Sequence, residues 1–190
     1  TTAETKAYAD VCCTSANAVE IVNAIAKEWG VNSVVLAPDA NLAANTDKKT
    51  DINVIGYPEK GCCPIHNIYS VEDVNRAKRD HPNATIIVHP ETPSAVASMS
   101  DYMGSTAQLL TYIEKHDSIK EYVIGTENEF IKMVSRKFPD KSFWTLNKKA
   151  YCPSMKKVTL ESILKILEAI DANDSDYLTK MKAVVEPEII

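Results

Sequence analysis

Two cysteines stand directly before a proline in this sequence, in the Cys-Pro pairs that begin at Cys63 and Cys152. Deprotonated thiols bind soft metal ions and iron–sulfur clusters, whereas free cysteine is also among the most buried residue types. A hydroxyl residue that can cap a helix, Ser70 or Thr159, follows each cysteine by seven residues. The matched spacing predicts two similar loops, each ahead of a helix, and leaves open whether the thiols bind metal or fill a core.

His66 follows Cys63 by three residues and could complete a Cys-x-x-His half of a metal site. The corresponding position after Cys152 is Met155, so the second motif does not repeat this arrangement. Zinc usually has four ligands, often from paired Cys-x-x-Cys motifs, and the sequence contains no such motif. We therefore expect His66 to be a loop residue that supports the site without binding metal. The roles of three cysteines without a counterpart in the other motif stay open: Cys12, Cys13 and Cys62.

His89 and Glu91 follow the apolar run "TIIV", which predicts a buried strand over residues 85–89. Side chains two residues apart on a strand lie on the same side, so the two could act together. Taken alone, a histidine before proline is more often structural, and a glutamate at a strand end often faces solvent.

Three hydroxyl residues lie where loops lead into predicted helices: Ser15, Ser105 and Thr106. Such hydroxyls commonly cap the helix. Helix N-termini also attract anions, so the same side chains could bind a substrate carboxylate. Both interpretations are compatible with the sequence.

Short β-branched runs alternate with helical patterns along the chain. The apolar spacing within residues 15–29 predicts an amphipathic helix whose apolar face includes Val22, Ala26 and Trp29. This alternation is typical of an α/β fold with parallel sheets. The predicted strands are residues 33–37, 52–55, 85–89 and 121–125.

Two halves of the chain resemble each other at a separation of about 90 residues. The matched segments are 1–16 with 92–107, 34–42 with 122–130, and 61–72 with 150–161. The match predicts two small three-layer units, residues 1–81 and 82–172, followed by a C-terminal segment, residues 173–190. The alternative is a repeat of packing alone.

The repeat also predicts what the chain lacks. Residues "TIIVHPE" precede Thr92 in the second unit, and their counterpart would precede Thr1, so we expect the first strand of the first unit to be missing. The last residues, "EPEII", are typical of a helix start without its helix. Asp39 and Glu127 occupy matching positions in the two units, and we expect them to hold loops in place.

Composition excludes some classes of function. The 190 residues are 45% apolar with a formal net charge of -5, and no run of Lys and Arg indicates binding to nucleic acid or to an anionic membrane. No apolar run is long enough to span a bilayer, and the first residues do not resemble a signal peptide. Five cysteines, an odd number, disfavour a disulfide framework. We expect a cytoplasmic protein.

Several motifs together resemble one known family. "TTAETKAYADVCCTSANAV", "LAPDANLA", "GCCPIH", "VHPE", "GST", "IGTE" and "CPSMKKVTLE" occur in the order found in quinolinate synthase. The resemblance implies three α/β domains around a pseudo-threefold axis, of which this chain would contain the second and third. It also implies a [4Fe-4S] cluster held by one cysteine per domain. The implied reaction condenses iminoaspartate with dihydroxyacetone phosphate to form quinolinate for NAD synthesis.

The resemblance gives individual residues roles. Cys63 and Cys152 would be cluster ligands, and one iron would stay open as a Lewis acid. Glu91 would be a general base, and His89 would contact the substrate. Three hydroxyl residues would bind substrate carboxylate or lie beside it: Ser15, Ser105 and Thr106. The third cysteine ligand, and a tyrosine and asparagine pair that the family carries upstream of Thr1, are absent, so we expect this fragment alone to be inactive.

Two further expectations concern partners and alternatives. As a transferase of NAD biosynthesis, the enzyme would be linked to L-aspartate oxidase or aspartate dehydrogenase, and it would need the missing N-terminal domain. The alternative is a non-catalytic α/β module that binds metal or phosphate. A ferredoxin-like electron carrier is disfavoured, because it would need four protein ligands and only two cysteines match.

Overall fold

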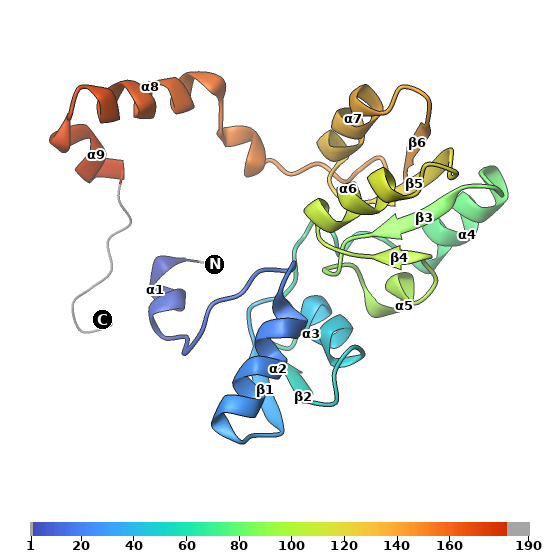
Figure 1. The fold of residues 1–190 in the computed structure, drawn as a ribbon, viewed down its shortest axis with the longest axis horizontal. Coiled ribbons are helices and arrows are strands. Elements are labelled where there is room, and N and C mark those ends of the chain that lie inside the picture. Colours follow the sequence, from blue (N-terminus) through green and yellow to red (C-terminus); the bar gives the residue numbers. More distant parts are fainter. Residues whose placement is uncertain (1, 182–190) are drawn as a thin grey trace. The chain divides into compact units, whose positions relative to one another are not determined.

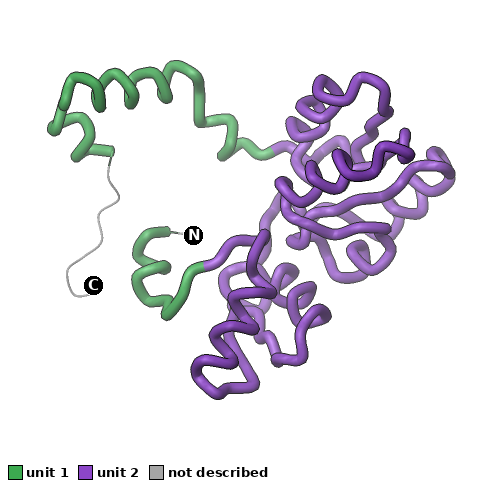
Figure 2. The backbone as a smooth tube through the Cα atoms, viewed as in Figure 1, with its two compact units in different colours: residues 1–12, 152–190 green, residues 13–151 purple. Residues whose placement is uncertain are grey.

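The chain divides into two compact units in a computed structural model that describes residues 2–181. Figure 2 shows residues 13–151 as one unit and residues 1–12 with 152–190 as the other. The predicted α/β class with parallel sheets is confirmed. The repeat boundaries at residues 81 and 172 stay predictions, and the predicted helix start in "EPEII" lies outside the described residues.

A small sheet forms in the first part of the larger unit. β1 (Ser33–Leu36) and β2 (Asn53–Gly56) pair in parallel, and α2 (Ala18–Trp29) and α3 (Ala40–Asp47) accompany them (Figure 1). A core forms on one face of this sheet, where Val54 meets Val22 of α2 and Ala43 of α3. On the opposite face the paired residues Val35 and Ile55 are exposed.

The helix predicted over residues 15–29 begins at Ala18. Val22 and Ala26 are buried as expected, but Trp29 is 48% exposed and does not belong to the apolar face. The helix ends there because Gly30 takes a left-handed conformation, with φ 66°, which stops further helical hydrogen bonding.

A larger parallel sheet forms in the second part of the same unit, with strand order β4-β3-β5-β6. Neighbouring strands pair in parallel throughout. The predicted strands at residues 85–89 and 121–125 correspond to β3 and β5. The four strands are β3 (Thr85–Val88), β4 (Tyr102–Met103), β5 (Glu121–Gly125) and β6 (Ser142–Thr145).

Helices cover both faces of the larger sheet (Figure 1). Ile86 and Val88 of β3 pack with α4 (Val71–Asp80) and α5 (Ser94–Ala97). Ile87, between them, faces the other side and packs with α6 (Thr106–Lys115) and α7 (Asn128–Lys137). This part of the chain is therefore a three-layer sandwich whose strand β3 is buried on both faces.

The two helices that follow the Cys-Pro motifs begin where the spacing predicts them. Ser70 caps α4 and Thr159 caps α8 (Leu160–Asp171), each in a reciprocal capping arrangement with the residue three positions later. The two Cys-Pro motifs thus stand ahead of capped helices, as their spacing predicts. The smaller unit otherwise contains α1 (Ala3–Ala7), the 3₁₀ turn η1 (Met155–Lys157) and α9 (Ser175–Met181). Among the described residues, every helix is too short or too polar to cross a bilayer.

Candidate functional site

The segment His89-Pro90-Glu91 lies at the carboxyl end of β3, where open parallel sheets usually bind ligands. The backbone N–H of His89 donates to the carbonyl oxygen of Gly125 at the end of β5, at 3.0 Å. Asn45 of α3, which is 1% exposed, donates from Nδ2 to the carbonyl oxygens of Pro90 and Thr92, each at 2.8 Å. A helix of the small sheet therefore fixes a loop of the large sheet.

Hydrogen bonds define the state of the His89 ring. Its Nδ1 accepts from the backbone N–H of Glu91 at 3.2 Å, and a backbone N–H can only donate. The neutral ring must therefore carry its proton on Nε2, which lies 3.2 Å from Oγ of Ser15 and can donate to it. Burial, followed by the charge of His66, lowers the pKa of His89 to about 4, so the ring is neutral near pH 7.

The loop that carries Cys63 is held against the start of α3. The Asp39 carboxylate accepts from the backbone N–H of Cys63 at 2.6 Å while it also caps α3 through Leu42. The carbonyl oxygen of Gly61 accepts from the N–H of Ala40 at 2.7 Å. A Cβ on Gly61 would overlap the carbonyl oxygen of Pro38, so only glycine allows this approach. Asp39 thus holds a loop, as expected.

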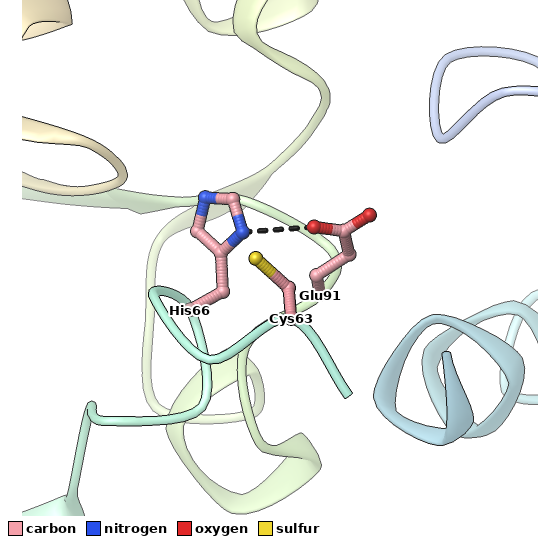
Figure 3. A group of neighbouring side chains, drawn as sticks. All are labelled: Cys63, His66 and Glu91. Carbon is pink, nitrogen blue, oxygen red and sulfur yellow. Dashed lines mark hydrogen bonds and ion pairs between the residues drawn. The ribbon is translucent and has the colours of Figure 1, made fainter. Parts of the chain in front are cut away.

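Cys63, His66 and Glu91 converge on one point, shown in Figure 3. One potential ligand atom from each residue lies within 4.8 Å of the others. His66 Nδ1 is 2.8 Å from Oε2 of Glu91, and His66 Nε2 is 3.0 Å from Oγ1 of Thr126. A thiol, an imidazole and a carboxylate at this separation could hold a metal ion.

The charges within this group stabilise one another. Burial works to lower the pKa of His66, but hydrogen bonds with Cys63 and Glu91 outweigh it and raise that pKa to about 9. Burial likewise works to raise the pKa of Glu91. The hydrogen bond from His66 and the nearby His89 together bring that pKa below its usual value. Near neutral pH the pair is therefore an imidazolium beside a carboxylate.

The remaining predicted site residues differ in where they lie. Ser15 does not cap α2, because the N-cap is Asn17, so the capping alternative is wrong for Ser15. Ser105 does cap α6, in a reciprocal arrangement with Gln108. Thr106 is the exposed first residue of that helix.

A hydrogen bond connects the residue after Ser15 to the first turn of α6. Gln108 donates from Nε2 to the carbonyl oxygen of Ala16 at 3.0 Å, next to Ser15. Ser15, His89, Glu91 and Cys63 are thus brought together within the larger unit. Cys152 belongs to the smaller unit, where its side chain is half-buried.

Comparison with known proteins identifies the chain's relatives. A model of the family described as quinolinate synthetase A protein matches residues 1–186. This chain belongs to that family. The quinolinate synthase of Thermotoga sp. (strain RQ2) is 44% identical over 167 residues, which are 88% of this chain and 54% of that protein. The quinolinate synthase of Methanopyrus kandleri is 39% identical over 194 residues, covering 98% of this chain and 64% of the relative.

A third relative gives the same result. The quinolinate synthase of Thermodesulfovibrio yellowstonii is 40% identical over 182 residues, covering 95% of this chain and 56% of its own length. The chain thus spans roughly half to two thirds of the quinolinate synthases it matches.

Sequence reasoning missed two contacts in this chain. It expected His66 to be a loop residue that supports the site, but it did not identify Glu91 as the residue that His66 contacts. It also did not single out Asn45, whose signal was only a polar residue on the apolar side of a helix. Both contacts join segments that are distant in sequence, so local spacing could not reveal them.

Proposed function

We propose that this chain supplies the second and third domains of a quinolinate synthase arranged about a pseudo-threefold axis. The complete enzyme, a transferase, condenses iminoaspartate with dihydroxyacetone phosphate to form quinolinate for NAD biosynthesis. Family membership supports the reaction class. The observation that carries the proposal is the convergence of Ser15, His89, Glu91 and Cys63 at the carboxyl end of β3.

The geometry suits each side chain to a role. Neutral His89 donates from Nε2 toward Ser15, which leaves the Ser15 hydroxyl hydrogen available for a substrate carboxylate. Glu91 is ionised and partly exposed, so it can remove a proton from bound substrate during tautomerisation and dehydration. Ser105 and Thr106, at the start of α6, add a helix N-terminus that favours anionic groups.

The residues of this chain fit part of an iron–sulfur site. The Cys63 thiol forms no disulfide and is half-buried, and its backbone N–H donates a hydrogen bond to Asp39 that fixes the loop. Cys152 occupies the matching position of the repeat, so the chain offers two ligands, Cys63 and Cys152, to a [4Fe-4S] cluster. A cluster with one open iron would supply Lewis acidity for removing a hydroxyl group.

The proposal is tested by measuring iron and acid-labile sulfide in the longest natural chain that contains these residues, purified without oxygen. We expect roughly four irons per chain, lost in Cys63→Ser and in Cys152→Ser. Cys62→Ser is the matched control, because it changes the neighbouring thiol and should keep the iron. Iron that survives both substitutions, or a protein that stays iron-free after reconstitution, would overturn the cluster assignment.

Quinolinate formation is measured on the same preparations. The substrate mixture contains dihydroxyacetone phosphate and iminoaspartate, the latter generated in place by L-aspartate oxidase or aspartate dehydrogenase. We expect the product only from protein that contains iron. A protein that binds one divalent ion at Cys63, His66 and Glu91 and forms no quinolinate would instead favour the non-catalytic metal-binding module.

A further inference from the structure

His66 occupies a position from which it contacts two residues of the candidate site. Its side chain is buried, and Nδ1 lies 2.8 Å from Oε2 of Glu91. Its ring stacks on the ring of His89, with centroids 4.1 Å apart and planes inclined by 10°. His66 therefore touches both of the side chains that follow β3 and to which we assign chemistry.

The other side of the His66 ring is anchored in the protein core. Nε2 lies 3.0 Å from Oγ1 of Thr126, which directly follows β5 and is 1% exposed. The buried Tyr69 donates from its hydroxyl group to the carbonyl oxygen of the same threonine at 2.7 Å. Both ring nitrogens are thus used, and the ring cannot turn without breaking a buried hydrogen bond.

The loop of the other Cys-Pro motif forms without a histidine at the corresponding position. The matching position in the other Cys-Pro motif is Met155, which is 59% exposed and is followed by a helix capped in the same way. The loop can therefore form with an apolar residue at this place. The feature peculiar to His66 is its hydrogen bond with Glu91, because a methionine side chain has no N–H with which to make one.

We propose that His66 is a positioning residue for Glu91. It holds Oε2 of the carboxylate through Nδ1–H, while the other carboxylate oxygen points away from the ring, as Figure 3 shows. A carboxylate held by one oxygen presents the second in a fixed direction for proton transfer. The stacked ring also restricts the rotation of His89. This inference rests on the function proposed above.

Two substitutions separate the hydrogen bond from the stacking in the longest natural chain that contains these residues. His66→Phe keeps an aromatic ring against His89 but removes the Nδ1–H donor, whereas His66→Asn removes the ring and can place an amide N–H close to the Nδ1 position. We expect His66→Phe to lower kcat about 10- to 100-fold, which is typical when a side chain that orients a catalytic residue is lost. KM should change less than about threefold. His66→Asn should recover about tenfold of the loss in kcat.

His81→Phe is the matched control, because His81 also stacks on an aromatic ring, that of Trp144, but does not contact Glu91. It should leave kcat within about twofold of the parent. The decisive comparison repeats His66→Phe in a protein that already carries Glu91→Gln. There His66→Phe should lower kcat less than about twofold, because a residue that acts by orienting the Glu91 carboxylate has no effect once that carboxylate is gone. Equal losses in both backgrounds would overturn the inference.

The contact between His66 and Glu91 can also be tested without measuring turnover, so that its failure can be told apart from failure of the proposed function. The urea unfolding midpoint is compared for the parent, His66→Phe, Glu91→Gln and the double variant. The downward shift caused by His66→Phe should become smaller when Glu91 is already Gln, because the two side chains share one contact. Additive shifts would contradict the contact itself. Coupled shifts in a protein that forms no quinolinate would keep the contact and reject the proposed function.

Discussion

Glu91 is the side chain on which the proposed chemistry depends most, and its neighbours keep it ionised. Burial works to raise the pKa of Glu91, but the hydrogen bond from His66 and the other contacts of the group together bring that pKa below its usual value. We expect Glu91→Gln to lower kcat at least about 100-fold, because an amide cannot accept the substrate proton. Initial rates of quinolinate formation test this, with iron content measured in parallel.

A surface glutamate provides the control for this substitution. Glu114 pairs with Lys137 in an exposed ion pair, so Glu114→Gln should leave the rate unchanged. If Glu91→Gln kept the parent rate at full iron content, the general base would have to be another group.

Asp73 makes a separate contribution at low pH. Its buried carboxylate is raised in pKa by desolvation, but hydrogen bonds from Arg76, Ser70 and Asn147 lower the pKa by more. A folded pKa below the unfolded value means that the stabilisation is present above the unfolded pKa and is lost as the pH falls through the folded pKa. Chemical denaturation between pH 7 and pH 2 compares the free energy of unfolding of the parent with that of Asp73→Asn. The parent should be the more stable protein at pH 7, and the difference should shrink below about pH 4.

The exposed Asp51 gives a matched comparison, since Asp51→Asn removes a surface carboxylate and should change the free energy of unfolding by less than about 0.5 kcal/mol. If the difference in the free energy of unfolding between the parent and Asp73→Asn stayed constant down to pH 2, the prediction would be wrong. The hydrogen bonds of Asp73 in the folded protein would then not lower its pKa.

At the scale of elements, α3 links the two sheets through Asn45. Asn45→Ala would leave the buried carbonyl oxygens of Pro90 and Thr92 without this donor. We expect a loss of about 1–3 kcal/mol in the free energy of unfolding. Because these carbonyls belong to the loop between His89 and Thr92, we also expect a lower kcat.

Asn41 lies one turn earlier on α3 and provides the control. Its side chain contacts Asn67 at the surface, so Asn41→Ala should cost less than about 0.5 kcal/mol. Similar losses from Asn41→Ala and Asn45→Ala in urea denaturation would show that the effect belongs to the helix rather than to the contact with the loop.

Gly61 sets how closely the Cys63 loop approaches the end of β1. A methyl group would overlap the carbonyl oxygen of Pro38, so Gly61→Ala must displace the loop. We expect less iron per chain and a lower unfolding midpoint, measured by metal analysis and thermal unfolding. Gly30→Asn is a suitable control, because Gly30 has open space and a left-handed backbone that asparagine tolerates. Normal iron content in Gly61→Ala would show that the Cys63 loop tolerates displacement.

Local patterns predicted the elements better than they predicted the contacts. Strand β3 and the caps Ser70 and Thr159 follow from residues close in sequence, so they could be predicted. The contact between His66 and Glu91 depends on how a turn packs against a strand end, and no local period encodes it. Ser15 shows the same limit, since it lies against His89 rather than capping its own helix.

At the scale of the whole molecule, the chain spans only part of the length of the relatives it matches. It covers 54% of the Thermotoga quinolinate synthase, and we propose two of its cysteines, Cys63 and Cys152, as cluster ligands. The small sheet exposes Val35 and Ile55 on one face, an apolar surface of the kind that mediates association. We expect the isolated 190 residues to form no quinolinate at an enzymatic rate, as measured by product formation under anaerobic conditions.

The longest natural chain, assayed in parallel, is the control for the isolated chain. Turnover by the 190 residues at a comparable rate would show that this part of the protein contains everything the reaction needs.

The clamp that Asn45 forms has a consequence for how the native state opens. Asn45 lies on α3, which packs against the small sheet, whereas the carbonyl oxygens to which it donates lie in the loop after β3. A transient opening that detached α3 would release this loop while the larger sheet stayed folded. Amide protons near Thr92 should therefore exchange with solvent at the rates of α3 rather than at the slower rates of β3.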